Sequence, residues 1–196
     1  MLSFLRELFF PDRCVGCGSW GRALCERCLS KIGGFKLYGE VYAFGFYEGV
    51  LKELIYKAKF ESYSEPLKEL LFFFKEDIYP LKDKVDLIVP VPEDPLRRRI
   101  FNHVSFLAEL LSLILDRALS ISLIKVFPTP PQVGLEKRER EKNLKGVFLA
   151  KESFHEKKVL LVDDVTTTGS TLRECSKALY NAGAFKVYKL VIAVNP

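Results

Sequence analysis

The sequence lacks any apolar run that could cross a bilayer. The best candidate, Val104 to Leu115, is short and carries Glu109 in its middle. The first ten residues are apolar, but Arg6 and Glu7 interrupt them. No basic segment precedes them, as one would in a secretory signal peptide. The sequence therefore predicts no membrane insertion and a cytoplasmic location.

The chain also lacks low-complexity tracts and internal repeats. Its 196 residues are 48% apolar and 28% charged, which is ordinary for a folded protein and excludes wholesale disorder. This length accommodates one sizeable core plus a small accessory module. The net charge of +5 is compatible with phosphate-bearing ligands or weak nucleic-acid contact, but it does not by itself select either.

From Val41 onward, strand-like and helix-like apolar patterns alternate along the chain. Strands are expected at residues 41–47, 86–92, 121–127, 159–162 and 187–194. Helices are expected at residues 51–58, 67–74, 101–118 and 170–181. This alternation predicts an α/β fold with a mostly parallel sheet and helices on both faces.

Two common phosphate-binding motifs are missing, namely G-x-x-x-x-G-K-[ST] and a G-x-G-x-x-G after a strand. A different candidate lies at Val159 to Thr171. Four aliphatic residues are followed there by Asp163 and Asp164, and then by a turn that leads into a helical pattern. Ligands of open α/β sheets bind at the carboxyl ends of strands, and a helix N-terminus attracts anions. Gly169 allows close approach of the chain to a phosphate, and the hydroxyls of Thr168, Ser170 and Thr171 supply further donors.

Adjacent acids beside an anion site are unusual, because carboxylates repel phosphate. The arrangement makes sense for a phosphorylated sugar. Its phosphate would lie in the turn, while Asp163 and Asp164 accept hydrogen bonds from sugar hydroxyls or face a metal. The alternative is ordinary capping of a helix, with the acids favouring the helix dipole. That alternative accounts for one threonine and one acid, but not for the whole string.

Four of the five cysteines form two C-x-x-C pairs, at Cys14, Cys17, Cys25 and Cys28. Each pair places two thiolates on one turn, and two such turns close a tetrahedron around Zn²⁺. Disulfides are the poorer explanation in a reducing compartment, and a redox site needs only one pair. Four cysteine ligands leave no open position, so the sequence predicts a structural zinc module at residues 1–35 and a second domain at residues 36–196.

The segment Val159 to Thr171 resembles the phosphoribosyl-pyrophosphate (PRPP) signature of type I phosphoribosyltransferases, with Thr166 at a position that is more often aliphatic. The resemblance implies that fold for the second domain. It also implies that Asp163 and Asp164 hold the ribose 2′ and 3′ hydroxyls. Residues Thr167 to Thr171 would hold the 5′-phosphate, with Mg²⁺ on the pyrophosphate. The position of Thr167 is often an aspartate in purine-salvage members, and its absence here argues against purine salvage.

Together with the cysteine pairs, the loop resembles the ComF family of competence-associated phosphoribosyltransferase-like proteins, over nearly the entire chain. Segments at residues 47–57, 89–102 and 129–148 also match the family. Two departures are Ile100 and His103, where the family usually has glycine and glutamine. His103 and His155 have no partner at metal-ligand spacing, and each is expected to be an ordinary surface or capping residue.

Two basic segments are candidates for binding pyrophosphate. The planar guanidinium groups of Arg97, Arg98 and Arg99 suit pyrophosphate or a nucleic-acid backbone, although a solvated turn is an equally simple explanation. Lys137 and Arg138 lie in a segment of alternating charge, residues 136–145. That pattern is typical of either a mobile lid over the pyrophosphate or an exposed helix.

Three functions fit these features. The first is an enzyme of the glycosyltransferase class, which transfers phosphoribose from PRPP to a nitrogen nucleophile with Mg²⁺, although no clear general base is present. The second is a module that binds single-stranded DNA through basic and aromatic residues of the cysteine segment, since the ComF resemblance implies DNA uptake with competence proteins. The third is a PRPP sensor without catalysis.

Overall fold

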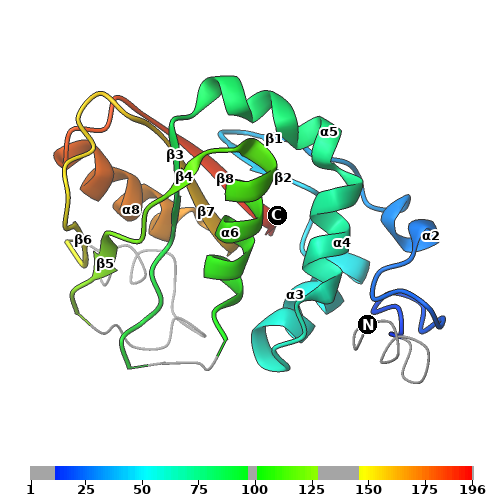
Figure 1. Cartoon of the computed structure of the whole chain (residues 1–196). Helices are drawn as coiled ribbons and strands as arrows, with labels where there is room; N and C mark the ends of the chain where they lie inside the picture. The colour runs from blue at the N-terminus through cyan, green and yellow to red at the C-terminus, as the bar shows by residue number, and fades with distance from the viewer. Residues whose placement is uncertain (1–11, 97–100, 128–145, 196) are drawn as a thin grey trace, which may run out of the picture.

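The computed structural model describes residues 12–96, 101–127 and 146–195. At its centre lies a six-stranded sheet in the order β1-β2-β8-β7-β3-β4 (Figure 1). The strands β2, β8, β7, β3 and β4 each run parallel to their neighbours in this series. Strand β1, at one edge of the sheet, is antiparallel to β2. The strands are β1 (Lys36–Tyr38), β2 (Val41–Ala43), β3 (Leu87–Pro90), β4 (Ala118–Leu119), β7 (Lys158–Thr166) and β8 (Lys186–Val194). A separate antiparallel pair consists of β5 (Leu123–Lys125) and β6 (Phe148–Ala150).

Helices cover both faces of the sheet, as the sequence predicts. The helical elements are α2 (Glu26–Leu29), α3 (Gly49–Phe60), α4 (Glu65–Phe73), α5 (Lys75–Ile78), a 3₁₀ helix (Tyr79–Lys84), α6 (His103–Leu115) and α8 (Ser170–Asn181). Side chains of adjacent strand residues alternate between two core clusters. Leu160 joins the cluster under α3, α4 and α6, whereas Leu161 joins the cluster under α8. Among the described helices, none is both long and apolar enough to cross a membrane.

Several elements differ in extent from the sequence prediction. Strand β7 continues past Val162 to Thr166, because it stays paired with β8 as far as Val194. The strand expected at residues 121–127 is present as the shorter β5, but it pairs with β6 in the separate antiparallel sheet, whereas β4, just before it, is the strand that pairs with β3. Helix α6 is shorter than expected and begins after Asn102, whose side-chain oxygen accepts hydrogen bonds from two backbone N–H groups of the first turn.

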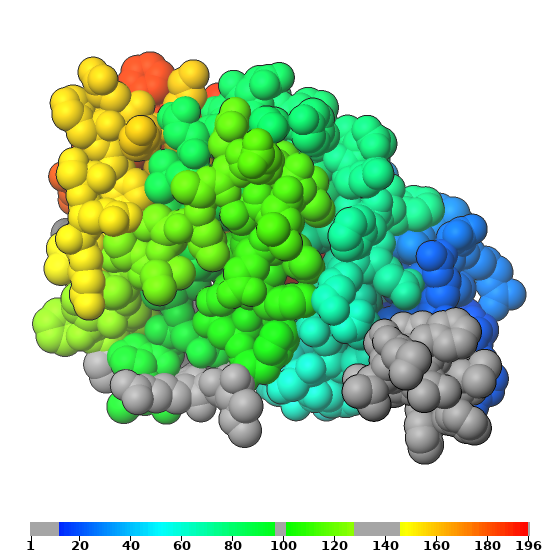
Figure 2. Space-filling view, viewed as in Figure 1, coloured from blue at the N-terminus to red at the C-terminus, as the bar shows by residue number. Residues whose placement is uncertain are grey.

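The cysteine segment lies at one end of the molecule, beside α3 and α4 (Figure 2). Leu24 and Leu29 are fully or almost fully buried, and they belong to the same core cluster as Leu54 of α3. The Leu24 N–H also donates a hydrogen bond of 3.0 Å to the Glu69 carboxylate of α4. The cysteine segment therefore shares one hydrophobic core with helices α3 and α4 of the rest of the chain. The division of the chain at residue 35 stays a prediction.

Candidate functional site

The candidate phosphate loop connects β7 to α8 at the carboxyl edge of the sheet. Gly169 immediately precedes α8 and has a φ of +71°, a left-handed conformation that glycine adopts without strain. The loop is braced from within, because the Thr168 and Ser170 hydroxyl oxygens lie 2.6 Å apart. The Arg173 guanidinium donates a hydrogen bond of 2.7 Å to the Thr168 carbonyl oxygen and another of 3.2 Å to the Ser170 hydroxyl. Helix α8 thus begins at a turn that a cation already contacts.

The N-terminus of α8 has the properties of an anion site. The first N–H groups of any helix lack partners within the helix. Gly169 carries no side chain to cap them, and within the described chain no side chain takes the capping position. A nearby contact, from the Ser170 N–H to the Thr168 hydroxyl, is long at 3.4 Å. These N–H groups and the helix dipole can therefore meet a phosphate.

The two acids near the end of β7, just before the loop, are in different environments. Asp163 is half-buried, whereas Asp164 is only 6% exposed. Burial and the neighbouring Asp164 carboxylate raise the pKa of Asp163 well above its usual value. Burial also acts to raise the pKa of Asp164, but a hydrogen bond from His103 and the charge of Lys59 together lower it below its usual value. The pair therefore consists of one carboxyl group that tends to keep its proton and one that stays ionised.

Asp164 is ionised because two side chains converge on one of its oxygens. The Lys59 ammonium lies 2.7 Å from Oδ2, and the His103 Nε2 lies 2.8 Å from the same atom. The other oxygen, Oδ1, accepts a hydrogen bond from the Val165 N–H. Lys59 comes from the end of α3, 105 residues away in sequence, and His103 is the first residue of α6.

The expectation that His103 is an ordinary surface or capping residue is wrong. Its side chain is buried, and Asn102 is the residue that caps α6. Because the cap fixes where the helix begins, the next side chain is directed inward against the sheet edge. Lys59 was not singled out from the sequence either. Both contacts join residues far apart in the chain, so no local pattern indicated them.

A cavity of about 150 Å³ lies beside the acid pair. Its lining comes from the loop after β3, the start of α6, the end of α3 and the end of β7. The lining residues include Lys59, Glu93, His103, Asp163 and Asp164. Strand β3 reaches this edge because it pairs with β7 as far as Val162, whose carbonyl oxygen accepts a hydrogen bond of 2.8 Å from the Val91 N–H. The end of β3 and Asp163 of β7 therefore lie at the same edge of the sheet. The predicted ligands Arg97, Arg98, Arg99, Lys137 and Arg138 lie outside the described residues.

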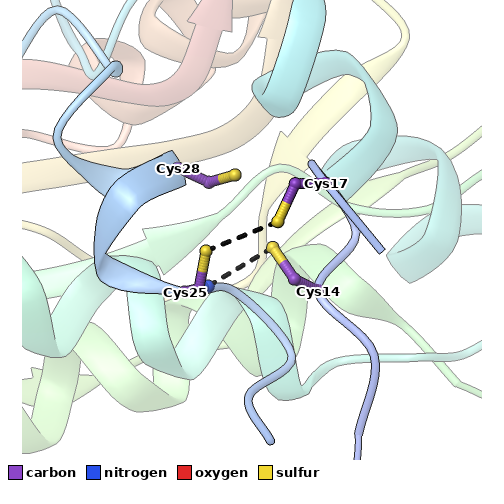
Figure 3. Close-up of side chains that lie close together, drawn as sticks. All are labelled: Cys14, Cys17, Cys25 and Cys28. Atoms are coloured by element: carbon purple, nitrogen blue, oxygen red, sulfur yellow. Dashed lines mark hydrogen bonds between the residues drawn. The ribbon is translucent and has the colours of Figure 1, made fainter. Parts of the chain in front are cut away.

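A second candidate site is the cysteine cluster (Figure 3). The four Sγ atoms lie within 4.8 Å of one another, and the Cys17 and Cys25 sulfurs are 3.7 Å apart. In a tetrahedron with Zn–S bonds of about 2.3 Å, two sulfurs are separated by about 3.8 Å. The four thiols and their spacing therefore fit a tetrahedral metal ion. All four are free cysteines in this structure.

The surroundings of the cluster differ between its inner and outer sides. Hydrogen bonds to Ser19 lower the pKa of the exposed Cys17 to about 5, whereas burial raises the pKa of Cys28 to about 12. Gly16 lies so close that an added Cβ would be 2.8 Å from the Cys28 Sγ. A glycine is therefore required where the first turn approaches the second.

Comparison with known proteins assigns the chain to a family. Residues 106–195 match the model of the phosphoribosyl transferase domain. Over 186 residues the chain is 33% identical to competence protein F of Haemophilus influenzae, and the match covers 89% of this chain and 81% of that protein. The chain belongs to the competence protein F (ComF) family.

A second relative agrees with this ComF membership. The DNA utilization protein YhgH of Salmonella typhi is 31% identical over 172 residues, which cover 83% of this chain and 74% of that protein. Among solved structures, the purine phosphoribosyltransferase of Pyrococcus horikoshii is 23% identical, with a TM-score of 0.46 over 66% of this chain and 74% of the other. The ComF chain thus combines a phosphoribosyltransferase-like domain with a cluster of four cysteines.

Proposed function

We propose that this ComF protein binds PRPP at the β7–α8 loop and transfers its phosphoribosyl group to a nitrogen nucleophile. The observation that carries this proposal is the juxtaposition, at one sheet edge, of an uncapped helix N-terminus and a pair of acids. An anion site and two carboxyl groups suit a ligand that carries both a phosphate and neutral hydroxyls. A phosphorylated ribose has both.

The 5′-phosphate is assigned to the start of α8. Residues Thr167 to Thr171 offer backbone N–H groups and hydroxyls, and Gly169 lets the chain approach the phosphate closely. Arg173 adds a positive charge next to Thr168 and Ser170. The ribose is assigned to the acid pair, which precedes the turn on β7 and borders the cavity.

The pyrophosphate is assigned to the cavity beside Lys59. Mg²⁺ binds oxygen ligands, commonly one or two carboxylates together with the phosphates of a substrate. Glu93 is among the residues that line the cavity, and a carboxylate is the kind of ligand that such an ion takes. A bound Mg²⁺ would neutralise charge on the leaving pyrophosphate. In the transfer, the bond from C1′ to the pyrophosphate oxygen breaks and a bond from C1′ to the acceptor nitrogen forms. The acceptor loses one proton to solvent, and pyrophosphate leaves.

The cysteine cluster is proposed to hold a structural zinc ion. Its four thiols would fill all positions of a tetrahedral ion, which leaves none for water or substrate. Bound zinc would join the turn at Cys14 and Cys17 to helix α2. Because this segment shares its core with α3 and α4, the metal would also stabilise the larger unit.

The biological setting is proposed from the relatives. The names competence protein F and DNA utilization protein link those proteins to DNA uptake and use. We infer that this chain acts in the same process, in the cytoplasm and together with competence proteins. A catalytically silent PRPP sensor would serve the same setting with the same pocket.

A second candidate function is binding of single-stranded DNA by the cysteine segment. The observation in its favour is an exposed stacked pair, since the Arg13 guanidinium lies 3.8 Å from the centroid of the Trp20 ring and Trp20 is 61% exposed. Further basic residues of the segment are Arg22, Arg27 and Lys31. Exposed aromatic rings flanked by cations suit stacking on nucleobases.

Calorimetric titration with PRPP and Mg²⁺ tests the proposed ligand. The wild-type protein is expected to bind one PRPP per chain, and the variant Asp163→Asn/Asp164→Asn to lose most of the heat. Asp77→Asn, an exposed change on α5, is the matched control and is expected to bind normally. Equal heat from the double variant would refute the loop assignment. Release of pyrophosphate with added nitrogen acceptors then separates an enzyme from a sensor.

A further inference from the structure

The family resemblance assigns both acids of β7 to the ribose, but the structure places them in different surroundings. Both oxygens of Asp164 are already engaged, Oδ2 by Lys59 and His103 and Oδ1 by the Val165 N–H. Asp163 accepts a hydrogen bond of 2.8 Å from the Asp164 N–H at Oδ1, and its side chain is half-buried at the cavity. Geometry thus favours Asp163 as the acid that meets a ligand.

The position of His103 strengthens this distinction. Asn102 caps α6, so His103 is the first residue of that helix and the positive end of the helix dipole faces Asp164. Because Asp164 is ionised, it accepts a hydrogen bond from Nε2, which places the ring proton on that nitrogen. The other ring nitrogen, Nδ1, is buried and has no partner in the described part of the chain. A second proton there would create a buried donor without an acceptor among those residues.

We propose that the two acids have different roles in ligand binding, and this inference rests on the proposed PRPP site. Asp163 contacts the ribose hydroxyls. Asp164 is a buried counter-ion that His103 orients and that holds the Lys59 ammonium at the cavity wall. His103 is therefore a positioning residue that acts on the ligand through Asp164 and Lys59.

This division explains how an acid pair can lie next to an anion site. The Lys59 ammonium lies 2.7 Å from Asp164, the acid of the pair whose pKa is lowered, and its positive charge offsets the negative charge of that carboxylate. The raised pKa of Asp163 reduces the second negative charge. The carboxyl pair consequently repels phosphate much less than two free carboxylates would.

The first test compares the two acids by stability and by affinity. Asp164→Asn leaves Lys59 and His103 without their anion, so its melting temperature is expected to fall by several degrees. Asp163→Asn is expected to keep the wild-type melting temperature or exceed it, and to bind PRPP with Mg²⁺ at least tenfold more weakly. If the two variants change both quantities alike, the proposed division is wrong.

The second test uses two substitutions of His103. His103→Gln retains an N–H donor that can reach Asp164 and is expected to bind PRPP within about threefold of wild type. His103→Leu fills a similar volume without a donor and is expected to bind about tenfold more weakly, as loss of a charge-assisted hydrogen bond predicts. Equal affinity of the leucine and glutamine variants would show that His103 serves packing alone.

A measurement on the wild-type protein needs no ligand. Nitrogen NMR of the His103 ring is expected to show the proton on Nε2, whereas a proton on Nδ1 would overturn the proposed orientation. The NMR result and the stability difference do not depend on PRPP binding. If wild type fails to bind PRPP but these two results hold, the proposed function fails and the Asp164 counter-ion arrangement stands. If wild type binds PRPP and these results fail, the division of roles is wrong.

Discussion

The conformation of Gly169 gives a prediction that separates backbone strain from ligand binding. Its φ of +71° lies in the left-handed region, where a residue with a Cβ atom costs about 1–2 kcal/mol. An added Cβ would lie 3.5 Å from the Arg173 Nη1, which is ordinary contact, so strain alone sets the cost of Gly169→Ala. At about 2–4 °C per kcal/mol for a chain of this size, the melting temperature should fall by about 2–8 °C.

Gly39 provides the matched control for this change. It lies in the turn between β1 and β2, with a φ of +61° and nothing within 4 Å of an added Cβ. Gly39→Ala should therefore cost a similar amount of stability. We expect calorimetry to show PRPP affinity reduced about tenfold in Gly169→Ala, because the variant relieves strain by distorting the phosphate turn, and unchanged in Gly39→Ala. Equal PRPP affinity of the two variants would contradict the assignment of the phosphate to this turn.

Four further predictions concern the two sites. Metal analysis should find one zinc per chain, and Gly16→Ala should lower that content because its Cβ would collide with the Cys28 Sγ; full zinc content in this variant would contradict the packing argument. Replacing Lys59 by Met should weaken PRPP binding about tenfold in calorimetry, and unchanged binding would remove Lys59 from the site. The raised pKa of Asp163 means that the native state retains a proton which the unfolded state releases above about pH 4, so wild type loses stability as pH rises beyond that point. Asp163→Asn lacks this loss, and its melting temperature relative to wild type should therefore rise between pH 4 and 7. A difference in melting temperature that stays constant over this range would contradict a raised pKa for Asp163. Trp20→Ala should weaken the binding of single-stranded DNA about tenfold at fixed salt in a gel-shift assay, and an unaltered shift would exclude stacking on this ring.

Much of the fold could be predicted because its signals are local. The helix at Ser170–Asn181 has the predicted bounds, since a glycine precedes it and its buried residues recur at helical spacing. The parallel sheet follows from the alternation of strands and helices. The end of β7 could not be predicted, because pairing with β8 extends it over polar residues that carry no apolar pattern. The pairing of β5 with β6, outside the main sheet, was likewise unpredictable, since a short apolar run does not indicate which sheet it joins.

Of the candidate site, only the residues that lie together in one segment of the sequence could be predicted. The acids, the glycine and the hydroxyl residues of the turn adjoin one another, and their order indicates both a phosphate and a sugar. The partners of Asp164 come from α3 and α6, and only the folded chain brings them together. Position 103 stands out in the sequence only as a departure from the family pattern, which does not indicate a contact with Asp164.

A crystal structure of the protein with PRPP and Mg²⁺ would show which residues contact each part of the ligand. We expect the 5′-phosphate to lie at the N-terminus of α8, against Gly169 and Thr171, and the ribose hydroxyls to lie within hydrogen-bonding distance of Asp163. Asp164 should keep its contacts with Lys59 and His103 in the complex. A 5′-phosphate bound away from the start of α8 would contradict the proposed site, and ribose hydroxyls bound to Asp164 instead of Asp163 would contradict the proposed division of the acids.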